Sequence, residues 1–240
     1  MSKLRIIGGF ALAAAMLLGI QAAPTVFAAG KKKASFKVRI ENISDKGGVT
    51  AVDGSKYPFV ASPGLYTASA SDLALFVDGR KATKGIEAQA EDGDPELLLK
   101  EALGQKVEGS FGIFNKPLGA DMPGPLLPGS SYEFTFTAVS GQRLSLYTMY
   151  GQSNDLFYAP ATPIELFVNG SPVVGDITDK LVLWDAGTEV NEAPGLGMYQ
   201  GPRQKAKNQG VDENGVVARV RDGFTYPAAK DVLRVTITAN

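Results

Sequence analysis

The stretch FKVRIE, residues 36–41, decides the fold class, because apolar residues occupy every second position and charged residues lie between them. This period of two is typical of a strand with one buried and one solvated face. A similar alternation returns in YEFTFT at 132–137, IELFV at 164–168 and LRVTI at 233–237. Turn signals such as Asp78-Gly79 separate the segments. Many short strands of this kind predict an all-β fold, an antiparallel two-sheet β-sandwich or a barrel.

One short helix is predicted between Asp94 and Gly104. Asp94 can cap its N-terminus, Pro95 suits the first turn, and Gly104 ends the apolar pattern. We expect this helix to pack at the side or end of the sheets. Less regular strand candidates lie at 73–77, 143–149 and 216–220.

The N-terminus predicts export. Lys3 and Arg5 precede an apolar run, and small residues follow as far as Ala28, so residues 1–28 are expected to be a cleaved signal peptide. An uncleaved N-terminal anchor is the alternative. The strand pattern then continues without a linker, so residues 29–240 are expected to form one domain. We therefore expect a protein that is secreted, periplasmic or attached to the cell surface.

The chain contains neither histidine nor cysteine. Their absence excludes nucleophilic schemes that need either residue, thiolate or imidazole zinc sites, and disulfides. Oxygen ligands remain, and these select hard cations such as Ca²⁺ or Mg²⁺. The 24 basic and 25 acidic residues give a formal net charge of −1. Such a balance offers no basic face, so no nucleic-acid partner is expected.

The segment LVLWDAGTE at 181–189 is the most suggestive local sequence. An apolar strand runs directly into an acidic loop, so we expect Asp185 at a sheet end, where Gly187 lets the backbone bend. Ordinary strand ends carry the same residue types, which is the alternative. The acidic cluster at 91–94 is better explained by a turn and a helix cap.

The run Asp-Ala-Gly-Thr-Glu at 185–189 resembles the acidic turn of the spondin N-terminal domain, which is found in F-spondin and mindin. Further landmarks follow in the order of that family: an opening strand at 36–42, Ser-Pro-Gly at 62–64, an acidic turn at 90–93, the loop Gly-Gln-Ser-Asn-Asp at 151–155 and a closing strand at 233–237. The resemblance covers nearly the whole predicted domain. It implies a C2-like sandwich that holds one calcium ion at one end.

Carried over by position, the resemblance implies that Glu133, Asp155 and Asp185 bind Ca²⁺. Each has another reading from the residues alone, since Glu133 lies on the polar side of its strand, Asp155 suits a turn and Asp185 suits a loop cap. Whether Glu189 or backbone carbonyls complete the metal shell stays open. Animal members carry cysteines and continue into thrombospondin-type repeats. Both are missing here, so the partners of those relatives are not carried over.

We expect an exported, non-catalytic calcium-binding module, a monomer that binds an extracellular protein or glycan as adhesion domains do. One alternative is a glycoside hydrolase that uses Asp185 and Glu189. The two lie in one turn, whereas catalytic carboxylates usually come from opposite walls of a cleft. A second alternative is contact with a membrane surface, although the sequence has no basic patch. A third is a structural envelope protein in which calcium serves stability only.

Overall fold

The computed structural model of the chain describes Met1, residues 31–70 and residues 73–240. The domain is the compact unit Lys31–Asn240. Apart from Met1, the predicted signal peptide at residues 1–28 lies outside the described residues. Over the described ranges, no helix has the length and apolar character needed to cross a membrane.

The first sheet is built around the alternating segment that begins the domain. Phe36, Val38 and Ile40 are buried on one face of this strand, and the charged residues between them face outward. Its antiparallel neighbours continue the pattern on both sides. The strands, in sheet order, are β12 (Gly175–Asp176), β15 (Leu233–Ala239), β1 (Lys33–Asn42) and β6 (Ser131–Val139).

The second sheet is also antiparallel and holds the segments that carry the candidate site. Its order is β14 (Ala218–Arg219), β13 (Leu181–Asp185), β8 (Leu156–Pro160), β7 (Arg143–Tyr150), β4 (Ala61–Ser69) and β5 (Gly109–Phe114), with β9 (Ile164–Glu165) also paired to β7. Two small ribbons pair β2 (Val49–Thr50) with β3 (Lys56–Tyr57) and β10 (Phe167–Val168) with β11 (Ser171–Pro172). The predicted antiparallel two-sheet sandwich is confirmed.

The space between the two sheets is filled by large apolar side chains. Val38 and Ile40 of β1 share this core with Leu146 of β7 and Tyr158 of β8. Aromatic rings also stack across it, as the rings of Tyr66 and Phe134 do with centroids 4.3 Å apart. Full burial of one such side chain contributes about 1.5–3 kcal/mol, so this core is the main source of the domain's stability.

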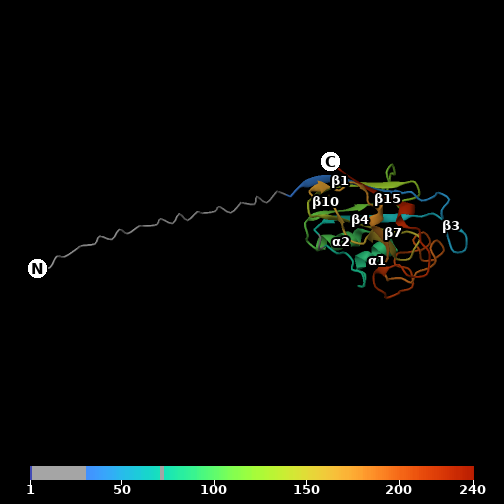
Figure 1. The fold of residues 1–240 in the computed structure, drawn as a ribbon. Helices are drawn as coiled ribbons and strands as arrows, with labels where there is room; N and C mark the ends of the chain where they lie inside the picture. The colour runs from blue at the N-terminus through green and yellow to red at the C-terminus, as the bar shows by residue number, and fades with distance from the viewer. Residues whose placement is uncertain (2–30, 71–72) are drawn as a thin grey trace. The chain divides into compact units, whose positions relative to one another are not determined.

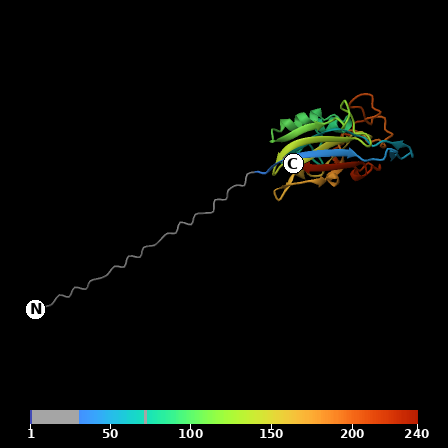
Figure 2. The same ribbon diagram turned by 90° about the horizontal axis from the view of Figure 1, so that it is seen from above.

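Two helices form a third layer on the outer face of the second sheet. They are α1 (Lys84–Glu91) and α2 (Glu96–Gly104), and in Figure 1 they lie below β4 and β7, opposite β1 and β15. Ile86 and Leu98 pack there in a separate core with Trp184. The view in Figure 2 also sets these helices apart from β1 and β15. A short helix α3 (Ala229–Val232) and the 3₁₀ helix η1 (Thr178–Lys180) flank β15.

Predictions of single elements differ in outcome. The predicted helix is α2, but its N-cap is Pro95 and not Asp94. Asp94 lies one residue earlier, where its Oδ1 atom accepts a hydrogen bond from the Glu96 amide. The acidic turn predicted at 90–93 is partly the end of α1, and the described residues form three α-helices where one was expected. The strand predicted at 73–77 is wrong, because that segment has no strand and buries Leu73 and Leu75 in the core with the helices.

A close backbone contact in the second sheet gives a first test. Gly64 of β4 has no room for a side chain, since an added Cβ would lie 2.1 Å from the Tyr147 carbonyl oxygen and 2.4 Å from the Phe114 ring. We expect Gly64→Ala to lower the free energy of unfolding by about 1–3 kcal/mol, as overpacking does. Urea unfolding measures this change.

The matched control is Gly104→Ala at the end of α2, where an added Cβ meets nothing within 4 Å. Alanine favours the helix more than glycine, so this variant should match or exceed the parent in stability. Equal urea midpoints for Gly64→Ala and the parent would contradict the close approach of β4 and β7 at Gly64.

Candidate metal centre

Strand pairing brings two of the predicted ligands together. In the antiparallel pair of β8 and β13, Leu156 at the start of β8 is opposite Asp185 at the end of β13. Asp155 directly precedes Leu156, so it emerges beside Asp185 at the same end of the sheet. The Ala186 amide donates to the Asp155 carbonyl oxygen at 3.1 Å and closes this corner.

A third carboxylate comes from the long loop after β13. The backbone at 187–190 pairs with the backbone at 211–215, where the Glu213 amide donates to the Thr188 carbonyl oxygen at 3.0 Å. This backbone pairing places Glu213 near the corner where β8 and β13 meet. One carboxylate oxygen each from Asp155, Asp185 and Glu213 then lie within 4.8 Å of one another.

The turn after Asp185 depends on a glycine. Gly187 has φ +66°, and an added Cβ would lie 2.6 Å from both the amide nitrogen and the carbonyl oxygen of Val216. Its own amide donates to Asp185 Oδ1 at 2.7 Å. A residue with a side chain would be strained at this φ and would collide with the backbone of Val216. Gly187 therefore permits the turn that directly follows Asp185.

Asp155 is fully buried, and its two oxygens differ sharply. Oδ2 accepts three hydrogen bonds, from the Thr188 amide at 2.7 Å, the Thr188 hydroxyl at 3.1 Å and the Glu189 amide at 3.0 Å. Oδ1 is buried and has no hydrogen-bond partner. A buried polar atom without a partner is costly, so Asp155 Oδ1 points to a missing electropositive ligand.

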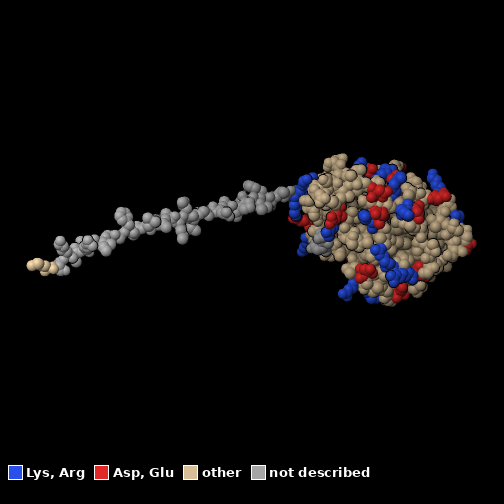
Figure 3. Space-filling model, viewed as in Figure 1, with Lys and Arg blue, Asp and Glu red and all other residues tan. Residues whose placement is uncertain are grey.

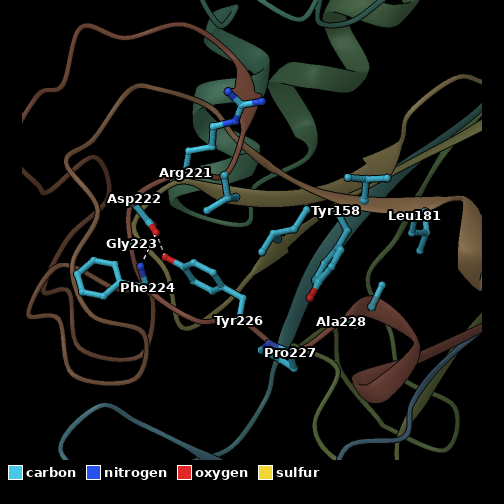
Figure 4. Close-up of a pocket in the computed structure, with 13 residues that line it drawn as sticks. Tyr158, Leu181, Arg221, Asp222, Gly223, Phe224, Tyr226, Pro227 and Ala228 are labelled. Atoms are coloured by element: carbon cyan, nitrogen blue, oxygen red, sulfur yellow. Dashed lines mark hydrogen bonds between the residues drawn. The ribbon is translucent and has the colours of Figure 1, made fainter.

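A side-chain amide and a further carboxylate lie close to Asp185. The Asn191 side-chain amide donates to Asp185 Oδ2 at 2.7 Å, and the carbonyl oxygen of that amide is buried without a partner. Asp222 lies nearby and is turned toward its own loop, where it accepts from the Phe224 amide at 2.9 Å and the Tyr226 hydroxyl at 2.5 Å (Figure 4). Asp222 therefore adds negative charge near Asp185, but its own carboxylate oxygens accept hydrogen bonds from Phe224 and Tyr226.

The electrostatics of the group favour a cation. Burial raises the pKa of Asp155, and the charge of Asp185 raises it further. Burial also raises the pKa of Asp185, with added repulsion from Glu213 and Asp222. No ion pair between described residues includes Asp155, Asp185 or Glu213. The guanidinium of the nearby Arg219 lies instead over the Trp184 ring, 4.1 Å from its centroid.

Glu133 does not join this group. It lies on β6 of the first sheet, where its carboxylate pairs with Lys37 at 2.9 Å and approaches Arg39 at 3.9 Å. The alternation of β6 directs Glu133 to the solvated face, as the residue pattern alone indicated. Glu213 is the carboxylate that the sequence did not single out. Its only local signal is an acidic pair in the glycine-flanked run GVDENG at 210–215.

No protein-family model and no curated protein sequence matches the chain.

The buried carboxyl groups predict an unusual pH dependence in the absence of metal. Burial raises the pKa of Asp155 to about 7 in the folded protein, against about 3.9 for an unperturbed aspartate. Between these two pH values the folded state binds more protons than the unfolded state. The contribution of Asp155 to the free energy of unfolding therefore decreases as the pH rises. We expect metal-free Asp155→Asn to be more stable than the parent at pH 8, by at least about 1.4 kcal/mol, the equivalent of one pKa unit.

The difference should shrink as the pH falls from about 7 and should be lost below about 4, where Asp155 becomes protonated in both states. Urea unfolding in excess chelator at several pH values measures it. Asp179→Asn serves as the control, since Asp179 is exposed and outside the site. A difference between Asp155→Asn and the parent that does not change with pH would contradict the assignment.

Proposed function

We propose that the protein is an exported calcium-binding module that binds an extracellular protein or glycan and has no catalytic role. The observation that carries the proposal is the buried, unpartnered Oδ1 atom of Asp155 beside Asp185 and Glu213. Calcium accepts six to eight oxygen ligands in irregular geometry, which suits carboxylates from three separate segments of the chain. Magnesium prefers a strict octahedron with several waters and suits such a corner less well.

Calcium would tie together segments that are otherwise joined by few apolar contacts. The loop at 186–215 is held mainly by polar contacts, such as those of Gln200 with the backbone carbonyl oxygens of Glu192 and Ala193 at 3.2 Å and 2.9 Å. In Figure 1 these loops gather at the end of the domain away from the C-terminus. Binding residues commonly sit on loops held by a rigid scaffold, so this end is the proposed binding face.

The proposed face has chemical features that suit a protein or glycan partner. Several apolar side chains of the loop are exposed: Val190, Leu196, Met198, Val211 and Val216. On the face seen in Figure 3, basic and acidic residues are interspersed. Exposed apolar groups among mixed charges favour a partner that is neither nucleic acid nor an acidic membrane.

The burial of the carboxylates argues for binding and against hydrolysis. Asp155 has no exposed surface, so a sugar ring cannot reach it. Asp185 lines a cavity of about 560 Å³, whereas Glu189 is 3 % exposed and does not line it. The pair Asp185 and Glu189 therefore does not flank a common cleft, which a glycosidase needs.

The resemblance to the spondin N-terminal domain belongs to the same proposal. The resemblance implies Asp155 and Asp185 as ligands, and Glu213 takes the place of Glu133 in the set that we propose. The proposed role as a monomeric adhesion-type module outside the cytoplasm rests on that resemblance together with the predicted signal peptide.

Thermal unfolding with calcium tests the metal. A ligand that binds only the folded state stabilises it by about 2.7 kcal/mol at one hundred times its Kd. For a domain of this size such a gain raises Tm by several degrees. We expect calcium to raise Tm for the parent and for Glu133→Gln, and to have a much smaller effect on Asp185→Asn.

An equal calcium response from Asp185→Asn and the parent would refute the assigned ligands, and no response from either would refute calcium binding. A lost response in Glu133→Gln would restore Glu133 as a ligand. Binding to arrays of glycans and matrix proteins, with calcium and with chelator, then tests the role. If chelator lowers the Tm of the domain but does not change its binding to these targets, calcium serves stability only and the protein is structural.

A further inference from the structure

The cavity drawn in Figure 4 lies beside the edge of the second sheet. Among the described residues, β14 pairs with Trp184 and Asp185 only, so the earlier part of β13 has no partner from that strand. The chain at 220–229 leaves a cavity of about 380 Å³ between itself and residues 181–183 of β13. Ligand pockets usually have volumes of about 300–1,000 Å³, so this cavity is large enough for a small ligand.

Three aromatic rings give the cavity an apolar wall. They belong to Tyr158 of β8 and to Phe224 and Tyr226 of the segment after β14. The Tyr226 ring packs edge-on against the ring of Tyr150, with the two centroids 5.7 Å apart, which limits its movement. The faces of aromatic rings suit a ligand that has a flat apolar side.

Polar groups line the same cavity at fixed positions. The carboxylate of Asp222 accepts hydrogen bonds from the Phe224 amide at 2.9 Å and from the Tyr226 hydroxyl at 2.5 Å. A carboxylate has more acceptor sites than these two bonds use, so Asp222 can also accept a hydrogen bond from a ligand hydroxyl. The exposed Arg221 adds hydrogen-bond donors beside it.

One hydroxyl group of the cavity wall has no partner. Tyr158 is almost fully buried, and its hydroxyl makes no hydrogen bond with a described residue. In Figure 4 this hydroxyl is directed toward Pro227 and Ala228, which also line the cavity. A buried polar atom without a partner is costly, so the Tyr158 hydroxyl favours a ligand that carries hydrogen-bonding groups.

The charges and the rings together indicate the class of ligand. Arg221 and Asp222 are the charged residues among those that line the cavity, and their charges are opposite. Such a pair favours neither an anion nor a cation. A saccharide has apolar C–H faces that suit the aromatic rings, and its hydroxyl groups both donate and accept hydrogen bonds, as Asp222, Arg221 and the Tyr158 hydroxyl require.

We propose that this cavity binds a neutral saccharide, as one unit of a larger glycan. This assignment rests on the proposed role as a binding module and names a glycan as its partner. It does not depend on calcium, because Asp155, Asp185 and Glu213 do not line the cavity. Asp185 and Glu213 line a neighbouring cavity that shares Asp222, so the saccharide would lie next to the candidate metal centre.

NMR titration of the protein with neutral oligosaccharides tests the assignment. The probes are trisaccharides of glucose, mannose, galactose and N-acetylglucosamine, each added with calcium and with chelator. We expect at least one of them to bind the parent. Loss of a hydrogen bond to a charged group weakens binding by about tenfold or more, so Asp222→Asn should weaken binding of that trisaccharide to this extent. Phe224→Ala should also weaken it, because this variant removes a ring from the apolar wall.

A milder variant guards against misfolding. Tyr226→Phe keeps the ring and removes only the hydroxyl that donates to Asp222, and it should weaken binding of the same trisaccharide. The matched control is Tyr66→Phe on β4, since Tyr66 does not line the cavity. This control should bind as tightly as the parent.

The outcomes separate this assignment from calcium binding. If no trisaccharide binds the parent, or if the cavity variants bind as tightly as the parent, the saccharide site is refuted, whatever calcium does to Tm. Binding of extended peptides in place of the trisaccharides would also refute it and would favour a protein partner. Trisaccharide binding that the cavity variants weaken and chelator leaves unchanged supports the site, even where calcium does not raise Tm.

Discussion

The arrangement at the loop end depends on the buried carboxylate of Asp155. Its Oδ2 atom accepts hydrogen bonds from both amides of the Thr188-Glu189 segment. These bonds hold the long loop at the corner where β8 and β13 meet. Its Oδ1 atom has no partner. One side chain thus anchors the loop with one oxygen and leaves the other without a partner. Its replacement by a side chain that cannot accept hydrogen bonds would remove the anchor.

This anchor lies within a group of acidic residues. One carboxylate oxygen each from Asp155, Asp185 and Glu213 lie within 4.8 Å of one another. Burial and repulsion oppose the ionisation of Asp155 and Asp185. A protein can relieve that cost by protonation or by binding cations. The chain has no histidine or cysteine, so oxygen ligands and hard cations are the chemistry open to it.

The helix layer contributes to the same region. α1 packs on the outer face of the second sheet and ends at Glu91, which brings a helix terminus to the loop after β13. Contacts between the loop and the end of α1 support this position, since the Asn208 amide donates to Asp92 Oδ1 at 3.1 Å. Ordering of the loop by a cation would therefore reach the helices and the proposed binding face together.

The alternation in β1 and β6 predicted by itself an antiparallel sandwich or barrel, because a period of two places every second side chain on one face that can be buried. It also predicted that Glu133 faces solvent. A local acidic turn marked Asp185 and Glu189, and the resemblance to a family added Asp155. Only the tertiary structure brought in Glu213, because the backbone pairing of a long loop joins residues far apart in the chain. Such contacts leave no periodic signal in the sequence, and burial turns ordinary loop carboxylates into candidate ligands only after the layers have assembled.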